Sequence, residues 1–132
     1  YAAPFASLLP DPKMANNIYF VNNVDEDDPA LQGIRARYKA KYNVEPTNKS
    51  YLGYDEILIL VEAIKQAAST DREAIRDALE NKINDLPICT GVFSMDPKTH
   101  MPIGLSMVVY KIENGKYISQ GRFIPEALRK SK

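Results

Sequence analysis

The 132-residue chain has the length of one ordinary domain, with a hydrophobic fraction of 45% and a charged fraction of 26%, both typical of globular proteins that fold in water. Seventeen Lys and Arg balance seventeen Asp and Glu, so no net charge draws nucleic acid to the surface. The longest apolar run, residues 57–61, is far shorter than the roughly 20 residues of a membrane span. Composition therefore argues against a disordered chain, a membrane-spanning chain and a nucleic-acid partner.

The N-terminal third combines a proline-rich segment, a short strand and a helix. Residues 1–17 hold three prolines without a clear period, which predicts a loop with one short helical turn. Residues 18–21 are β-branched or aromatic and are followed by Asn22-Asn23, which predicts a strand ending in a turn. Asp28-Pro29 then predicts a helix start, and Asn43 its end. This helix has an apolar stripe that is expected to face a core, at Leu31, Ile34, Tyr38 and Tyr42. Its solvent-facing side is expected to carry the basic residues Arg35, Arg37, Lys39 and Lys41.

Two further helices are predicted in the middle of the chain. Residues 52–68 are apolar nearly all round in their first half, so this helix is expected to be covered on several sides. Thr70 and Glu73 match a T-x-x-E capping box, which predicts that Thr70 starts the next helix. That helix places Ile75, Leu79 and Ile83 on its inner face.

The remainder of the chain favours strands. Residues 88–95, 105–112 and 117–118 are rich in β-formers, 96–102 form a proline-bounded turn, and 113–116 carry an Asn-Gly hairpin signal. Residues 129–132 are expected to fray. The predicted class is α/β: three helices with flanking strands and a C-terminal β-hairpin.

The sequence predicts no catalytic residue, metal site or cofactor, and hence no enzyme. His100, the only histidine, lies in a turn, and Cys89, the only cysteine, lies in an apolar run where a buried thiol is commoner than a reactive one. A small hydrolase built on these two residues remains an alternative. The acidic residues 25–28 lack the spacing of a calcium loop and are interpreted as a solvated loop that favours the following helix N-terminus.

The start of the most hydrophobic helix is a candidate ligand site. Lys49, Ser50 and Tyr51 combine a cation, a hydroxyl and an aromatic ring beside a helix N-terminus, where backbone N–H groups favour a carboxylate. The alternative is that Tyr51 and Tyr54 simply pack.

Several short motifs occur in a recognisable order and spacing, at residues 18–21, 27–29, 38–46, 53–55, 63–67, 69–79, 90–96, 108–112 and 114–117. Their order resembles that of the leucine/isoleucine/valine-binding family of type I periplasmic solute-binding proteins of ABC transporters. Residues 96–99, Asp-Pro-Lys-Thr, depart from the family's simpler glycine-containing turn. By this resemblance the chain is a C-terminal fragment of a two-lobed protein.

The resemblance implies a division of residues 1–132 as one partial domain. Residues 1–24 and 105–132 are expected to be C-lobe-like and 25–90 N-lobe-like, with a hinge crossing at 22–25 and a return near 90–104. It also implies that Asn22 and Asn23 face a ligand at the hinge, beside Lys49, Ser50 and Tyr51.

The implied function is solute capture for an ABC importer, with an amino acid, branched-chain by this resemblance, or a related metabolite bound by the full-length parent. The expected partner is the transporter permease, and the expected location is periplasmic or extracellular, with a lipid anchor on a preceding segment as one option. The fragment is expected not to bind by itself, and either to repack into one compact unit or to form a homodimer. A sensing or regulatory receptor domain of the same fold is the alternative function.

Overall fold

The computed structural model describes residues 5–126, which form two antiparallel three-stranded sheets, three α-helices and two short 3-10 helices. The elements in chain order are η1 (Ala6–Leu8), η2 (Pro12–Ala15), β1 (Tyr19–Asn22), α1 (Pro29–Tyr42), α2 (Asn48–Ala67), α3 (Arg72–Asn81), β2 (Leu86–Ile88), β3 (Gly91–Asp96), β4 (Met101–Ile103), β5 (Met107–Glu113) and β6 (Lys116–Phe123). The α/β class, the three helices and the C-terminal hairpin are confirmed. The expected fraying at 129–132 falls outside the described residues.

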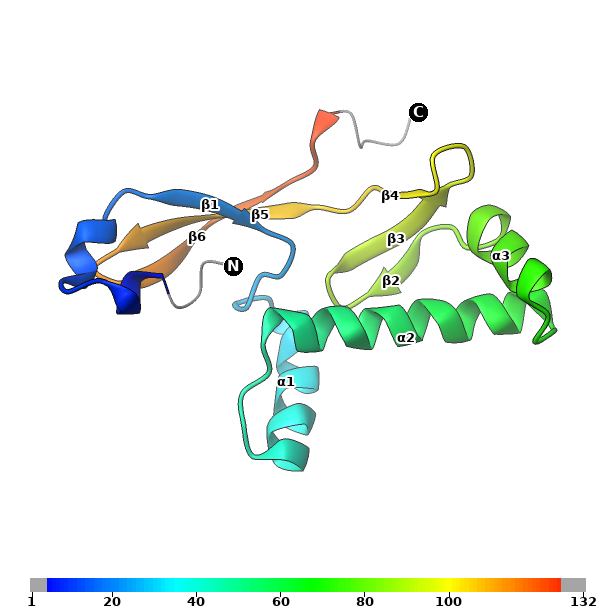
Figure 1. The fold of residues 1–132 in the computed structure, drawn as a ribbon, viewed down its shortest axis with the longest axis horizontal. Coiled ribbons are helices and arrows are strands. Elements are labelled where there is room, and N and C mark those ends of the chain that lie inside the picture. The colour runs from blue at the N-terminus through cyan, green and yellow to red at the C-terminus, as the bar shows by residue number, and fades with distance from the viewer. Residues whose placement is uncertain (1–4, 127–132) are drawn as a thin grey trace.

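The first sheet has the strand order β1-β5-β6 and lies at one end of the elongated molecule (Figure 1). Val108, Tyr110 and Ile112 alternate along β5 and are buried, as expected where one face of a strand is covered. The two 3-10 helices cover this face, and Ala6 and Ala15 pack with Ile112. The N-terminal segment thus gives the first sheet its own hydrophobic core.

The second sheet has the order β2-β3-β4 and lies beside α2 and α3 at the other end of the molecule (Figure 1). Ala63 of α2, Ile83 after α3 and Phe93 of β3 form its core. Val24, Leu31, Tyr51 and Cys89 form a separate cluster that joins α1 to α2 and to the β2–β3 turn. None of these residues belongs to the core of the first sheet.

The chain crosses twice between these two halves. It leaves the first sheet after Asn22, at the end of β1, and reaches α1 at Pro29; it returns through Gly104–Ser106, between β4 and β5. We call the first sheet with η1 and η2 the first unit. We call α1, α2, α3 and the second sheet the second unit. Two short connections therefore join two separately packed units.

The caps of α1 confirm the predicted limits of this helix. Asp28 Oδ1 accepts a hydrogen bond from the Ala30 N–H at 2.9 Å, with Pro29 at the first helical position. Asn43 ends the helix in the left-handed conformation, φ 55°. Leu31 is fully buried, but Tyr42 at the end of the predicted apolar stripe is 53% exposed.

Two predicted helix starts were wrong. Helix α2 begins at Asn48, not at residue 52, because Thr47 caps it: the Thr47 N–H donates to Ser50 Oγ at 3.1 Å. Helix α3 is capped by Asp71, whose Oδ1 accepts from the N–H groups of Glu73 and Ala74, both at 3.0 Å. Because the Asp71 carboxylate accepts two amide hydrogen bonds, the N-cap of α3 is Asp71 and not Thr70, the residue that the capping box predicted.

Five strands follow the helices instead of the predicted three. The expected strand at 88–95 is broken into β2 and β3 by a turn at Cys89 and Thr90, followed by Gly91 at φ 147°. Part of the expected turn at 96–102 forms β4, which pairs with β3 from Ser94 to Asp96. The hairpin turn was predicted correctly, and Asn114 and Gly115 both have the positive φ that a two-residue turn requires.

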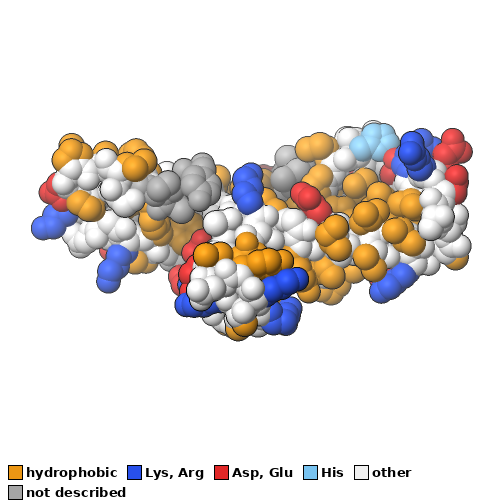
Figure 2. Space-filling view, turned by 60° about the horizontal axis from the view of Figure 1, so that its bottom comes forward, with side chains coloured by type: hydrophobic (Ala, Val, Ile, Leu, Met, Phe, Trp, Pro, Cys, Tyr) orange, Lys and Arg blue, Asp and Glu red, His pale blue; other side chains and the backbone are white. Residues whose placement is uncertain are grey.

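The expected covering of α2 is absent over much of its surface. Ile57, Leu58, Leu60 and Val61 are 60%, 36%, 43% and 43% exposed. Figure 2 shows hydrophobic side chains gathered over the helical half of the molecule. The apolar run at 57–61 is typical of a buried helix, but within residues 5–126 these four side chains are left largely open to solvent. None of the helices described is long and apolar enough to cross a membrane.

Candidate functional site

A cleft of about 660 Å³ lies between the first sheet and the N-terminal end of α2. Both units contribute to its walls, and the crossing that follows β1 forms part of it. The lining residues are Phe20, Val21, Asn22, Glu26, Asp27, Pro46, Thr47, Asn48, Lys49, Tyr110, Lys116 and Tyr117. The cleft thus combines aromatic rings, amides and charges of both signs, which suits a small polar organic molecule.

Asn48 connects α2 to the crossing segment at the edge of this cleft. Its Nδ2 donates to Asn22 Oδ1 at 2.5 Å and to Asn23 Oδ1 at 3.2 Å. Its own Oδ1 is buried and, among the described residues, has no hydrogen-bond partner. Since buried acceptors are normally paired, this oxygen is available to a donor on a bound molecule. Sequence reasoning missed Asn48, whose only signal is its place next to Lys49.

The structure distributes the five predicted ligand residues over different environments. Asn22 and Lys49 line the cleft, whereas Asn23 lines a smaller hollow of about 170 Å³ between α2 and the second sheet. Ser50 Oγ accepts the helix-capping hydrogen bond from Thr47. Tyr51 is only 2% exposed and packs in the core with Val24 and Leu31. Their roles toward a ligand stay predictions, and the cleft brings only Asn22 and Lys49 together.

Three aromatic rings form the sheet side of the cleft. Phe20 stacks on Tyr110 with ring centroids 5.3 Å apart and meets Tyr117 edge-on at 5.6 Å. The Tyr110 hydroxyl donates to Asp25 Oδ1 and accepts from the Glu26 N–H, both at 3.1 Å. Burial raises the pKa of Tyr110 well above its ordinary value, so the hydroxyl stays protonated and keeps donating. This tyrosine ties the crossing segment to the first sheet.

Asp55 is the main buried charge of the second unit. It is 3% exposed and accepts three hydrogen bonds, from the Cys89 N–H at 2.7 Å, the Thr90 N–H at 3.0 Å and the Thr90 hydroxyl at 2.7 Å. Cys89 Sγ in turn donates to the Tyr51 carbonyl at 3.4 Å. Asp55 therefore fixes the β2–β3 turn against α2.

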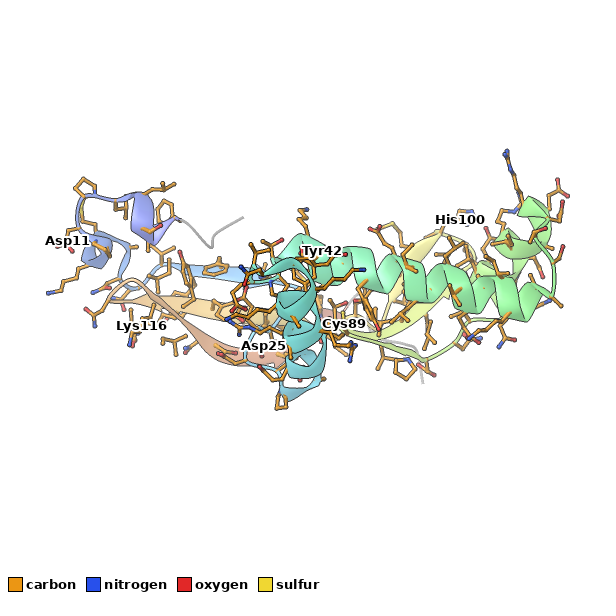
Figure 3. The ribbon with its side chains drawn as sticks, turned by 90° about the horizontal axis from the view of Figure 1, so that it is seen from below. Asp11, Asp25, Tyr42, Cys89, His100 and Lys116 are labelled. Carbon is orange, nitrogen blue, oxygen red and sulfur yellow. The ribbon has the colours of Figure 1, made fainter. Side chains whose placement is uncertain are left out.

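The alternative nucleophile pair is not assembled. Burial, followed by the hydrogen bond to Asp55, raises the pKa of the Cys89 thiol to about 12, so almost no thiolate forms at neutral pH. His100 lies in the turn before β4, where its Nδ1 is 3.0 Å from Glu80 Oε1. Figure 3 shows the two residues in different parts of the second unit. This pair offers no nucleophile with an adjacent base.

The acidic loop after β1 is exposed at Glu26 and Asp27 and supplies the cap of the following helix, as predicted, and Asp25 makes contacts that the sequence did not predict. Asp25 accepts from Tyr110 and, at 3.4 Å, from the Ser119 hydroxyl, while Asp28 caps α1. Among residues 5–126, no group of three or more His, Cys, Asp or Glu side chains could hold a metal ion.

The sequence of residues 3–116 matches the family model described as "Periplasmic binding protein". A search of curated proteins found no match.

Three solved structures with a similar fold are much longer than this chain. A leucine-binding protein from Thermotoga maritima is 27% identical, with a TM-score of 0.68 over 86% of this chain and 33% of that one. A solute-binding protein from R. palustris, solved in complex with benzoate, is 18% identical, with a TM-score of 0.65 over 95% and 35%. A branched-chain amino acid ABC transporter periplasmic ligand-binding protein from Burkholderia xenovorans is 15% identical, with a TM-score of 0.72 over 86% and 32%. The chain spans about a third of the length of these proteins.

Proposed function

The chain belongs to the periplasmic binding protein family, and we propose that it is part of the solute-binding component of an ABC importer. The proposed solute is an amino acid with a branched side chain or a related small metabolite. The observation that carries this proposal is the cleft between two separately packed units joined by two short crossings. Such an arrangement can close on a small molecule by bending at the crossings.

We also propose a division of the chain between two lobes. We assign residues 1–24 and 105–132 to the C-terminal lobe and 25–90 to the N-terminal lobe of a two-lobed parent. The separate hydrophobic cores of the two units support this assignment.

The proposed ligand contacts come from both sides of the cleft. Asn22 and Lys49 line it, and the lysine ammonium suits the carboxylate of an amino acid. The unpartnered Oδ1 of Asn48 suits the ammonium group of the same ligand. We keep Asn23 and Ser50 as indirect contributors, because their contacts hold the crossing and the helix N-terminus in place. For Tyr51 the same indirect role is proposed, through the core beneath the cleft.

The isolated chain is not expected to hold the solute by itself. About two thirds of the length of these relatives has no counterpart in this chain, and the exposed apolar side of α2 is a surface that such additional chain would cover. The partner proposed for the parent is an ABC permease, and the proposed location is the periplasm or the extracellular side.

Calorimetric titration of the chain and of its full-length parent against the twenty amino acids and benzoate tests the proposal. We expect the parent to bind one of these solutes near micromolar affinity and the isolated chain to bind none. Asn48→Ala and Lys49→Ala in the parent should weaken binding about tenfold or more, the cost of roughly one charge-assisted hydrogen bond. Asn84→Ala, at an exposed position outside the cleft, is the control and should bind as the parent does. Binding by the parent that neither cleft variant changes would contradict the site, and a parent that binds no solute would contradict the function.

A further inference from the structure

Arg122 of β6 reaches out of the first unit and contacts both crossings and the second unit. Its Nη1 donates to Ser106 Oγ at 2.8 Å, in the return crossing. The same nitrogen donates to the Thr90 carbonyl at 3.4 Å, in the β2–β3 turn. Its Nη2 makes no hydrogen bond within the described residues but forms an ion pair at 3.7 Å with Asp28 Oδ2, at the end of the outward crossing. One guanidinium therefore contacts three segments that are far apart in sequence.

Two of the three partners of Arg122 are held by the second unit. The Thr90 N–H and hydroxyl are fixed by the buried carboxylate of Asp55. Asp28 caps α1 through the Ala30 N–H. A displacement of the first unit relative to the second must therefore stretch the contacts of Arg122 with Thr90 and Asp28, because these two partners cannot follow without breaking a cap or a buried hydrogen bond.

Arg122 and Asp28 are both partly buried. The side chain of Arg122 is 24% exposed and that of Asp28 31%, so the pair is shielded from solvent more than most surface ion pairs. A guanidinium presents several donors in one plane, which allows it to address a hydroxyl, a carbonyl and a carboxylate together. A lysine ammonium at this position could not keep all three contacts.

We infer that Arg122 is the positioning residue of the hinge, and that its contacts with Ser106, Thr90 and Asp28 set the angle between the two units. The inference deepens the proposed function, on which it rests for its consequence, because this angle is what a solute in the cleft would change. Without the guanidinium, the crossings bend over a wider range and the cleft loses its preset width.

The test is a distance measurement between the two units without any solute. Nitroxide labels on Lys13→Cys, at an exposed position of η2 in the first unit, and on Arg76→Cys, on the exposed side of α3, report the angle by pulsed electron spin resonance. Cys89 is buried and its thiol has a raised pKa, so it stays unlabelled at neutral pH. Circular dichroism of each variant confirms folding.

Arg122→Met should broaden the distance distribution and shift its maximum, and Arg122→Lys should give an intermediate width. Removing the partners in the double variant Ser106→Ala/Asp28→Asn should reproduce the effect of Arg122→Met, since asparagine still caps α1. This double variant decides the question if Arg122→Met does not fold.

Arg37→Met, which removes an exposed arginine of α1, is the control and should leave the distribution unchanged. An unchanged distribution in the Arg122 and partner variants, or equal broadening in the control, would overturn the inference. A distribution that responds to Arg122 in a parent that binds no solute would refute the proposed function alone.

Discussion

Removing the Asp55 carboxylate should destabilise the chain more than any other single polar change in the second unit. Asp55→Ala leaves the buried N–H groups of Cys89 and Thr90 without an acceptor, while the Thr90 hydroxyl can rotate to find another. Each buried unsatisfied donor costs about 1–3 kcal/mol, so the loss expected for the two N–H groups is about 2–6 kcal/mol. Asp55→Asn keeps one accepting oxygen and should lose about 2 kcal/mol.

The loss is measured as the change in the free energy of unfolding in urea, followed by circular dichroism. The rate at which a thiol reagent reacts with Cys89 gives a second, local readout, since the β2–β3 turn should open more often when its anchor is missing. Glu56→Ala, at the exposed neighbouring position on α2, should change stability by less than about 0.5 kcal/mol. Equal losses for Asp55→Ala and Glu56→Ala would refute the anchoring role.

Four further results follow from contacts described above. Asp71→Ala should cost about 1 kcal/mol in urea unfolding and Thr70→Ala almost nothing; the reverse order would restore the capping box at Thr70. Leu31→Ala should cost about 2–5 kcal/mol, because this fully buried side chain leaves a cavity; a loss below about 1 kcal/mol would contradict its burial. Cys89 has a folded pKa of about 12 against an ordinary 9, so its contribution to stability should be complete below pH 9 and lost as the pH rises to 12; alkylation as rapid as that of a free thiol at pH 8 would disprove the burial. Ile57→Glu should lower self-association of the isolated chain without loss of stability. Equal molecular masses of the variant and the unchanged chain in light scattering would count against the exposed side of α2 as the surface of self-association.

Local signals in the sequence were sufficient for much of the fold. The cap and proline at Asp28-Pro29 and the Asn-Gly turn at 114–115 each involve residues adjacent in sequence, so their geometry could be read directly. The break between β2 and β3 could not, because it depends on Asp55, more than thirty residues away along the chain. A run of β-formers carries no sign of a distant carboxylate that binds its backbone.

The candidate site was predictable only in part, for a similar reason. Lys49 and Asn22 were named from their places at a helix N-terminus and a strand end, and both line the cleft. Tyr51 was named with them, yet a difference of two residues on a helix turns a side chain to another face, here into the core. The contribution of Asn48 arises from hydrogen bonds to a segment distant in sequence.

The pairing of β1 with β5 has a consequence for how the chain folds. Asn22 ends one strand opposite Val108 at the start of its neighbour, so the whole segment 23–107 is topologically an insertion in a hairpin. Closing such a long loop before any of it is ordered is entropically costly, and contacts of this kind slow folding. The inserted unit, whose helices and hairpins are local, is then expected to form early and bring the two strands together. Replacing residues 23–107 by a two-residue turn would convert the first sheet into a continuous meander, and pairing of β1 with β5 would no longer require the closure of a long loop.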